Sequence, residues 1–493
     1  MNKPPTEEQD KIIQAVSSGK TLKVSALAGT GKTSTLLMIA EQYPRRKGLY
    51  LAYNAALKKE AAKKFPEWID CKTVHGLAYR DFGSLYKSHL SLKGNPDSLI
   101  LNLGIEAIHS GLQIKKGVSL AFTTSEMVQL TRDVVRRFTY SAKEDISLTD
   151  VEALTEKEMV ESFPDLTKEG DFYKQNAAAV DVFIEELNQR LLTYGRDLWA
   201  CQVDKRNFDI PAEHDTYLKL YQLSKPVINA YDYIMLDEAQ DANPCILDIL
   251  SHQACQIIYV GDKHQQIYAF RGTINAMDKI QGETFYLTQS FRFGNEIAQE
   301  ANVVLENLGS PSRIKGLPSL PGFLGVPEVP YTVLARTNLK LIEECIGKIE
   351  EGWKCCLLAD TRSIVSLIRS VFYLWMKKPQ WVKDERVLEF PNWKELVTFA
   401  REEEDPELLL AVHFILSHGG DALDRLRVLE DCARYPEQRA DIVFSTVHKA
   451  KGREWERVVL CNDLTFANEH EMNLYYVAVT RASRVLYHTF PNT

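Results

Sequence analysis

The chain has 493 residues, of which 45% are hydrophobic and 26% are charged, and its formal net charge is −8. This length allows about three or four domains with sizeable cores. An acidic chain does not coat nucleic acid by overall positive charge, although a local basic channel remains compatible with this composition. No apolar run reaches the roughly 18 residues that a membrane span needs. The start of the chain also lacks the apolar core of a secretion signal, so we expect a protein that stays inside the cell.

The nine cysteines follow no metal-binding spacing, which favours a reducing compartment and argues against a structural zinc site. Short apolar runs that end in Gly, Asp, Ser or Thr alternate with helix-like segments along most of the chain. This alternation predicts an α/β fold with parallel sheets covered on both faces. Because ligands bind beyond the carboxyl ends of such strands, the polar residues after each run are the candidates for chemistry. Two mainly helical stretches, about 81–180 and about 362–439, are interpreted as insertions.

The first candidate site in chain order is "TLKVSALAGTGKTSTLLMIA", which predicts a strand, a loop of small residues and a helix. The loop from Ala26 to Thr33 fits the P-loop pattern, with alanine in place of the usual first glycine. Backbone N–H groups of such a loop surround phosphate oxygens, the lysine reaches the β- and γ-phosphates, and the threonine hydroxyl holds Mg²⁺. The alternative is a glycine-rich turn before an ordinary helix. The residues expected to contact ATP here are Ala28, Gly29, Thr30, Gly31, Lys32, Thr33 and Ser34.

A second strand end, "YIMLDEAQD", supplies the acidic groups that a P-loop requires. Asp237 is expected to hold Mg²⁺ together with Thr33, and Glu238 is expected to polarise the attacking water. Taken alone, these acids could equally form a solvated turn. Their pairing with a P-loop favours ATP hydrolysis.

A third apolar run, "CQIIYV", leads into "GDKHQQIYAFRG", whose first half is polar and whose second half is aromatic. Together with "ALAGTGKT", "LDEAQD", "LTQSFRFGNEI", "STVHKAKGREW" and "YYVAVTRA", this stretch resembles the superfamily 1 helicases of the UvrD/Rep type, in order and approximate spacing. The stretches "VHKAKGREW" and "FPNWKELVTFAREEEDPELL" are most similar to the F-box DNA helicases. The sequence begins directly at the ATPase, so no F-box is expected.

The resemblance implies two RecA-like P-loop NTPase domains with parallel sheets, each carrying a mainly helical insertion. ATP would bind in the cleft between these domains and single-stranded DNA across both. The implied ranges are 1–80 with 181–280 for domain 1A, 81–180 for insertion 1B, 281–361 with 440–493 for domain 2A, and 362–439 for insertion 2B.

Nucleotide-site residues are also implied by the resemblance. Gln9 would read the adenine edge, Phe291 would stack on adenine, and Glu454 would contact the ribose. Arg292 would touch the γ-phosphate, Gln265 would sense it, and Arg481 would be the arginine finger of the second domain. Such a finger is worth about 10³–10⁵ in rate. The alternative for Arg481 is a surface arginine that caps a helix.

The DNA contacts implied by the resemblance combine stacking with phosphate binding. Stacking on an aromatic side chain is worth about 1–3 kcal/mol per base and tolerates any sequence. The family usually has phenylalanine where this chain has Ala52, with Tyr53 one place later, and tryptophan where it has Phe270. Tyr268 and Phe270 could instead be core aromatics. The expected DNA-contacting residues are Asn54, Thr73, His75, Tyr268, Phe270, Arg271, Arg336, Thr337, His448 and Lys451.

We therefore expect an ATP- and Mg²⁺-dependent translocase on single-stranded DNA that acts as a helicase. A 3′→5′ polarity and a role in DNA repair or recombination, by unwinding duplex or stripping recombinase filaments, are implied by the family. The expected partners are single-stranded DNA, single-strand/duplex junctions, and a recombinase or single-strand-binding protein. We expect a monomer or weak oligomer, nucleoid-associated in the cytoplasm of a bacterium or phage host, or nuclear in a eukaryote. Two alternatives remain open: a nucleotide-switched binding protein without processive unwinding, and an RNA-directed motor.

Overall fold

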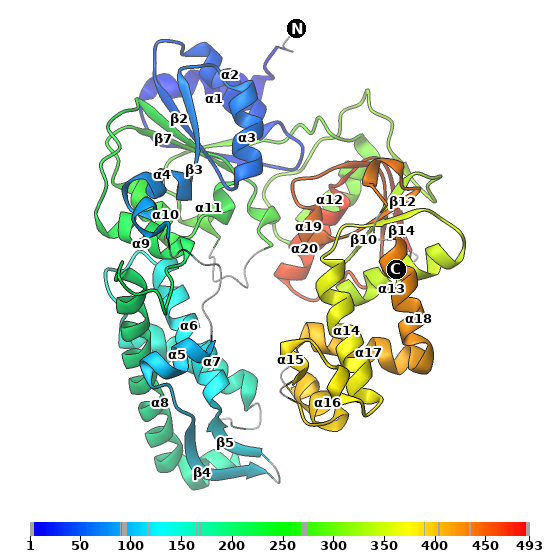
Figure 1. Cartoon of the computed structure of the whole chain (residues 1–493). Coiled ribbons are helices and arrows are strands. Elements are labelled where there is room, and N and C mark those ends of the chain that lie inside the picture. Colours follow the sequence, from blue (N-terminus) through cyan, green and yellow to red (C-terminus); the bar gives the residue numbers. More distant parts are fainter. Residues whose placement is uncertain are drawn as a thin grey trace. The chain divides into compact units, whose positions relative to one another are not determined.

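The computed structural model describes residues 4–88, 90, 96–115, 118–163, 166, 170–267, 275–388, 390–402, 405–432 and 435–489. It confirms the α/β class with two six-stranded sheets (Figure 1). The described residues divide into two compact units, each built around one sheet. The first unit comprises residues within 4–25, 32–263 and 275–286, and the second comprises residues within 26–31, 264–267 and 287–489.

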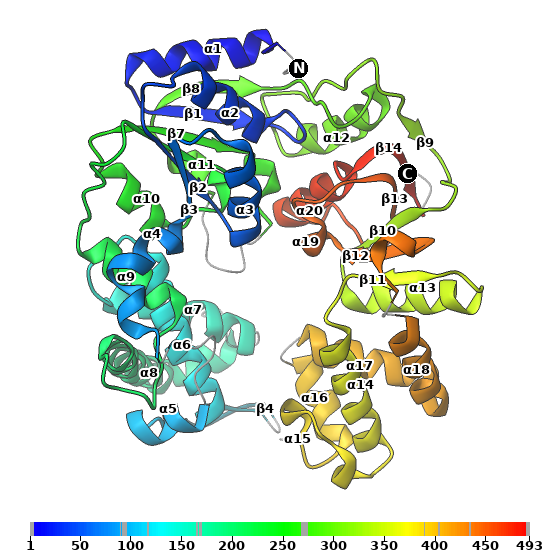
Figure 2. The same ribbon diagram turned by 45° about the horizontal axis from the view of Figure 1, so that its top comes forward.

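The sheet of the first unit has the strand order β3-β2-β6-β7-β1-β8 (Figure 2). Adjacent strands from β3 to β1 pair in parallel. All residues of β2, β6 and β7 are buried, as the continuous apolar runs predicted. β8 belongs to this sheet although it lies beyond the predicted domain boundary at residue 280. The strands are β1 Leu22–Ala26, β2 Gly48–Ala52, β3 Ile69–Thr73, β6 Tyr233–Leu236, β7 Gln256–Gly261 and β8 Glu283–Leu287.

Four of the helices around this sheet begin at residues whose side chains cap the helix start. Thr6 and Gln9 form a capping box at α1, and Asn54, Thr73 and Asn243 cap α3, α4 and α10 through their side-chain oxygens. These caps satisfy backbone N–H groups that a helix start would otherwise leave without a partner. The helices are α1 Glu7–Ala15, α2 Lys32–Gln42, α3 Ala55–Lys64, α4 Val74–Asp81, α9 His214–Leu223, α10 Pro244–Ser251 and α11 Ala276–Lys279.

The first insertion is mainly helical, as expected, but it also contains a β-hairpin that the sequence interpretation missed. Strands β4 and β5 pair antiparallel, and helices α6 and α7 pack against α8 (Figure 1). The 33-residue helix α8 runs through the predicted boundary at residue 180 and returns the chain toward the sheet. The elements are α5 Pro96–Leu103, β4 Ile108–Lys115, β5 Val118–Phe122, α6 Thr124–Tyr140, α7 Leu148–Ser162 and α8 Asp171–Val203.

The sheet of the second unit has the order β11-β12-β10-β13-β14-β9, and every neighbouring pair is parallel. Helix α12 packs against α20, and α13 packs against β10, β11 and β12. The strands are β9 Phe323–Leu324, β10 Tyr331–Ala335, β11 Cys355–Leu357, β12 Ile442–Thr446, β13 Trp455–Leu460 and β14 Ala482–His488, and the helices are α12 Asn295–Asn307, α13 Asn338–Glu350, α19 Val447–Ala450 and α20 Glu469–Val479.

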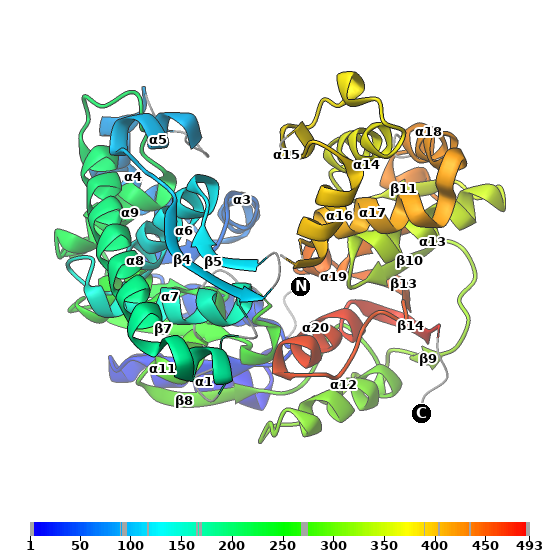
Figure 3. The same ribbon diagram turned by 90° about the horizontal axis from the view of Figure 1, so that it is seen from below.

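The second insertion is a helical bundle that shares its hydrophobic core with this sheet. Buried residues of β10 and β12, such as Val333 and Phe444, belong to the same cluster as Phe372 and Phe414 of the bundle. Figure 3 shows the bundle beside α13. Within the described residues, no helix combines the length and apolar character needed to cross a membrane. The bundle comprises α14 Thr361–Trp375, α15 Glu385–Leu388, α16 Trp393–Glu402, α17 Pro406–His418 and α18 Ala422–Cys432.

A buried lysine of helix α9 binds the first insertion. Lys219 of α9 is fully buried, and its ammonium group donates to the carbonyl oxygens of Ser141 and Lys143, just after α6. The same ammonium lies 4.4 Å from the ring centre of Phe138. Burial lowers the pKa of Lys219 to about 8, against 10.5 in an exposed chain.

We predict that Lys219→Met lowers the free energy of unfolding by about 1–3 kcal/mol at neutral pH, because two carbonyl groups lose a donor. Between pH 8 and 10.5 the unfolded chain binds more protons than the folded chain at this residue, so raising the pH stabilises the wild type relative to the variant. Chemical denaturation across this range measures both effects. A substitution cost that shrinks with rising pH would contradict the assignment, and Lys11→Met, at an exposed ion pair, is the control.

Candidate functional site

Four of the residues predicted at the phosphate site lie together in the first unit. The carboxyl ends of β6, β7 and β1 are neighbours in the sheet, and α2 begins at Lys32, within the P-loop pattern. The ammonium group of Lys32 is 2.8 Å from Oε2 of Glu238, and the hydroxyl of Thr33 donates to Oδ2 of Asp237 at 2.9 Å. The sheet order therefore brings together two segments that lie about two hundred positions apart in the sequence. The catalytic roles of these residues stay predictions.

The charges of this cluster stabilise one another. Burial disfavours the charged form of Lys32, yet Glu238, Asp262 and Asp237 together raise the pKa of this lysine above its usual value. Burial and the neighbouring Glu238 raise the pKa of Asp237. The cluster thus keeps Lys32 cationic, as phosphate binding requires.

The sequence interpretation missed Tyr50, whose hydroxyl donates to Oδ2 of Asp237 at 2.8 Å. Tyr50 is 1% exposed and lies in β2, next to β6. The carboxylate of Asp237 thereby has two hydroxyl donors, Tyr50 and Thr33, that fix its direction. A polar aromatic residue inside an otherwise apolar strand was the available signal.

Mg²⁺ prefers oxygen ligands and commonly takes one or two of them from the protein and the rest from phosphates and water. The Thr33 hydroxyl and the Asp237 carboxylate, which face each other in the first unit, match that donor set. Among the residues that the structure describes, no three His, Cys, Asp or Glu side chains gather into a metal-binding group. These oxygens fit a magnesium ion that arrives with a nucleotide.

The P-loop residues 26–31 belong to the second unit, where they contact the segment after β8 and helix α20. The N–H of Ala28 donates to the hydroxyl of Tyr476 at 3.1 Å, and the carbonyl of Gly29 accepts from the N–H of Phe291 at 2.8 Å. Gly29 has φ 71°, and a Cβ atom at this position would lie 2.6 Å from Oγ of Ser290. Glycine is therefore required here by both conformation and space. The sequence interpretation assigned no role to Tyr476.

The predicted arginine finger is packed inside the second unit. Arg481 is 1% exposed, and its guanidinium donates to the carbonyls of Val477 and Arg453 and lies 3.5 Å from Oε1 of Gln265. The carbonyl of Gln265 also accepts from the ammonium of Lys451 at 2.7 Å. The structure thus brings together Gln265 and Arg481, which are expected to contact the nucleotide, and Lys451, which is expected to contact DNA. The alternative for Arg481 is a surface arginine that caps a helix; the side chain is buried, yet it donates to the carbonyl of Val477 in the last turn of α20, so the capping part of this alternative matches the structure.

Other predicted nucleotide contacts also have protein partners. Nε of Arg292 is 2.6 Å from Oε2 of Glu454, and its Nη1 donates to the carbonyl of Thr480 at 2.9 Å. Phe291 is 36% exposed, whereas Gln9 is buried and donates to the hydroxyl of Thr35 at 3.1 Å. Ser34 is exposed. Their contacts with adenine, ribose and γ-phosphate stay predictions.

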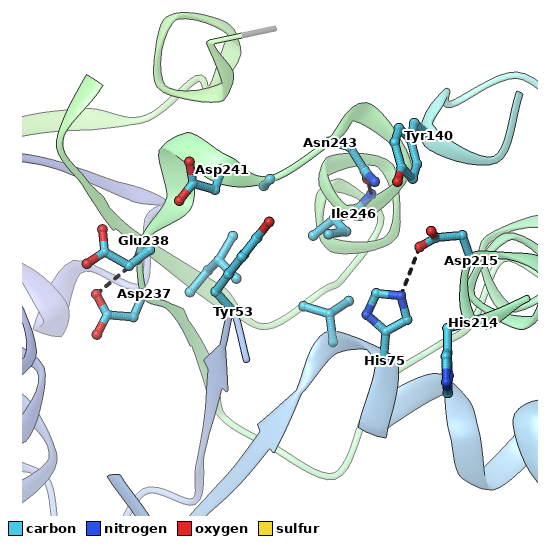
Figure 4. A pocket seen from close by; sticks show the side chains of 13 residues that line it. Tyr53, His75, Tyr140, His214, Asp215, Asp237, Glu238, Asp241, Asn243 and Ile246 are labelled. Atoms are coloured by element: carbon cyan, nitrogen blue, oxygen red, sulfur yellow. Dashed lines mark hydrogen bonds and ion pairs between the residues drawn. The ribbon is translucent and has the colours of Figure 1, made fainter. Parts of the chain in front are cut away.

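A cavity of about 320 Å³ lies in the first unit. It is lined by Asp237 and Glu238 and by residues of the segments predicted to contact DNA, such as Tyr53 and His75. In Figure 4, Asp237 and Glu238 lie on one side of Tyr53, and His75 and Asp215 lie on the other. Nε2 of His75 is 2.9 Å from Oδ1 of Asp215, a partner that the sequence did not reveal. Ala52, at the position where the family usually has phenylalanine, is fully buried. The next residue, Tyr53, is 37% exposed and supplies an aromatic side chain to the cavity. The other lining residues are Val74, Tyr140, His214, Leu236, Asp241, Ala242, Asn243 and Ile246.

Several predicted DNA contacts are also helix caps. Asn54, Thr73 and Thr337 accept backbone N–H groups at the starts of α3, α4 and α13. Nε of Arg336 is 3.0 Å from both carboxylate oxygens of Glu471. Burial and, to a smaller extent, the nearby positive charge of Arg336 lower the pKa of His448 to about 4. This histidine is therefore neutral at physiological pH. Tyr268, Phe270 and Arg271 lie outside the described residues, and their roles stay predictions.

Comparisons with known proteins agree with the sequence resemblance. The family described as an AAA domain matches residues 9–271, and the UvrD-like helicase C-terminal domain matches residues 441–487. The chain is 28% identical to F-box DNA helicase 1 of Gallus gallus, over 98% of this chain and 48% of the relative. It is also 28% identical to F-box DNA helicase protein 1 of Schizosaccharomyces pombe, over 98% of this chain and 57% of that protein.

A probable DNA helicase of Mycoplasma pneumoniae is 23% identical, over 93% of this chain and 78% of that protein. The chain spans about half the length of the two F-box helicases that it matches. The AAA-domain match alone covers more than half of this chain, and the second match lies in the C-terminal region of the second unit. The chain therefore belongs to the AAA-domain family, and its residues 441–487 are similar to the UvrD-like helicase C-terminal domain.

Proposed function

We propose that this protein is an ATP-dependent translocase on single-stranded DNA that unwinds duplex. The observation that carries the proposal is the cluster of Lys32, Thr33, Asp237 and Glu238, which lies beyond the carboxyl ends of β1 and β6, the two parallel strands that flank β7. A P-loop lysine, a hydroxyl and two carboxylates in this arrangement form the protein part of a phosphoryl-transfer site. The names of the relatives, all DNA helicases, support DNA as the substrate.

In the proposed hydrolysis, Lys32 binds the β- and γ-phosphates, and the Thr33 hydroxyl and Asp237 hold Mg²⁺, which supplies charge neutralisation when bound. Glu238 accepts a proton from the attacking water, and Arg481 stabilises the charge that develops on the γ-phosphate. We propose that the negatively charged phosphates draw the ammonium group of Lys32 away from Glu238 when nucleotide binds. This exchange would free the Glu238 carboxylate to accept the water proton.

The cavity beside Glu238 supports a link between the binding of single-stranded DNA and the hydrolysis of ATP. Its wall includes Asp237, Glu238 and three residues of the two segments predicted to contact DNA, namely Tyr53, Val74 and His75. A base placed against Tyr53 would exclude water from the side of the cavity next to the acids. We therefore propose that DNA stimulates ATP turnover through this cavity.

The finer parts of the proposal rest on the resemblance to UvrD/Rep-type helicases. They are a 3′→5′ polarity, a role in repair or recombination, and action on junctions or on recombinase filaments. A recombinase or single-strand-binding protein is the proposed protein partner, with the chain acting as a monomer or weak oligomer. The location would be the cytoplasm of a bacterium or the nucleus of a eukaryote.

The function is tested by ATP turnover with and without single-stranded DNA and RNA, alongside strand displacement on substrates with 3′ or 5′ tails. We expect turnover to rise with single-stranded DNA and displacement to require a 3′ tail. Turnover that DNA does not change would favour a nucleotide-switched binding protein. Stimulation by RNA alone would favour an RNA-directed motor.

We predict that Lys32→Ala lowers the rate of ATP hydrolysis by at least about 100-fold, because a charge aimed at the phosphoryl group is lost. The melting temperature measured by calorimetry should change little, since the substitution removes one member of a partly solvated ion pair. Lys20→Ala, at an exposed loop residue, serves as the matched control and should hydrolyse ATP at the wild-type rate. Retained hydrolysis in Lys32→Ala would exclude the assigned P-loop.

We predict that Tyr53→Ala raises the dissociation constant for single-stranded DNA by about 5- to 100-fold, the effect of losing one stacked base. Turnover at saturating ATP without DNA should stay near the wild-type value, because Tyr53 is not among the residues assigned to bind or hydrolyse ATP. Fluorescence anisotropy with a labelled oligonucleotide measures binding. Tyr286→Ala, at an exposed tyrosine of β8, is the control, and equal losses in both variants would contradict a role for Tyr53.

A further inference from the structure

Gln240 is a fully buried amide directly behind the acidic cluster. It lies in the short 3₁₀ helix Ala239–Asp241 that follows β6, and its side chain is 0% exposed. Its Nε2 donates to Oε2 of Glu238 at 2.7 Å. The same carboxylate oxygen is 2.8 Å from the ammonium of Lys32. Gln240 therefore helps to direct the carboxylate to which the water-polarising role is assigned.

The other end of the same amide binds the neighbouring strand. Oε1 of Gln240 accepts the backbone N–H of Asp262, the first residue after β7, at 3.0 Å. One partner accepts and the other donates, so only a carboxamide in a single orientation can bond to both. Glutamate could accept from Asp262 but would repel Glu238, and methionine could form neither hydrogen bond.

The backbone around Gln240 is shaped for this contact. A Cβ atom on Gly261 would lie 2.6 Å from Oε1 of Gln240 and 2.9 Å from Sδ of Met277, so a side chain at position 261 would displace the amide. Glu238 has φ 52° and ψ 42°, a left-handed conformation that is uncommon for residues other than glycine. Such a conformation persists where the surrounding contacts hold it, and two of the contacts to Glu238 come from Gln240 and Lys32.

The backbone that Gln240 binds leads into the segment that contains Gln265. Asp262 is 1% exposed, and three residues further along the chain Gln265 lies beside Arg481. A displacement of residues 262–265 would reach the Glu238 carboxylate through one side chain, without passing through the nucleotide.

We propose that Gln240 is a positioning residue for ATP hydrolysis, which aims the Glu238 carboxylate and couples it to the segment that begins at Asp262. This inference rests on the proposed ATPase function. It assigns to Gln240 an effect on the chemical step, and it leaves nucleotide binding to Lys32 and the P-loop. The amide should therefore affect kcat much more than affinity for ATP.

The test compares Gln240→Met and Gly261→Ala with the wild-type chain at saturating DNA. We expect kcat for ATP to fall by about 10- to 150-fold in Gln240→Met, the equivalent of one hydrogen bond to a charged group. The dissociation constant of a fluorescent, non-hydrolysable ATP analogue should stay within about threefold, because the phosphate-binding groups are unchanged. Gly261→Ala should reduce kcat in the same way, since it displaces the amide but keeps its chemistry.

Gln256→Met is the matched control, because Gln256 lies at the other end of β7 and its buried amide donates to the carbonyl of Lys20 at 2.8 Å. It should lose comparable stability and keep kcat. Gln240→Glu should lose more activity than Gln240→Met, since it places a second carboxylate beside Glu238. A kcat within threefold of the wild type in folded Gln240→Met, or a loss of analogue affinity as large as the loss of kcat, would overturn the inference. Absence of turnover in the wild-type chain would instead overturn the proposed function itself.

Discussion

The partly buried ion pair between Lys32 and Glu238 is the interaction on which the rest of the site depends. A charge removed from water is stable only when opposite charges and hydrogen bonds replace its hydration. Lys32 has Glu238 at 2.8 Å, with Asp237 and Asp262 close enough to favour its charged form. Those acids follow β6 and β7, and the lysine follows β1, so the pair exists because these three strands are neighbours. The strand order of the sheet is thus also the condition for the chemistry.

Polar side chains around the cluster are fixed by more than one hydrogen bond. Asp237 is bound by Thr33 and Tyr50, and Glu238 is bound by Lys32 and Gln240. The hydrogen bonds from Tyr50 and Gln240 leave these carboxylates with little reorganisation to make when charge develops on a substrate, which is how preorganised sites lower reaction barriers. The arginines differ in their partners. Arg292 is paired with a carboxylate, whereas Arg481 is surrounded by carbonyl and amide oxygens.

The residues expected to contact DNA show how one side chain serves both fold and function. Asn54 and Thr73 cap helices that begin at the ends of β2 and β3, so their positions are fixed by the sheet. His75, in the first turn after Thr73, is oriented by Asp215 of α9. A helix start after a parallel strand therefore places polar groups at the sheet edge where ligands bind. The cavity that these segments share with Glu238 connects the two proposed ligands within a single unit.

The sequence by itself determined the α/β class, the P-loop, the acidic strand end and the family, because each is encoded by short segments with local rules. Apolar runs predict buried parallel strands, and small residues before a helix predict a phosphate loop. Only the tertiary structure revealed Tyr50, Gln240, Asp215 and Tyr476, since each acts through a partner distant in the sequence. The hairpin β4–β5 and the place of β8 were likewise decided by pairing between strands, which no local pattern specifies. Contacts across a sheet depend on strand order, and strand order is a property of the whole folded unit.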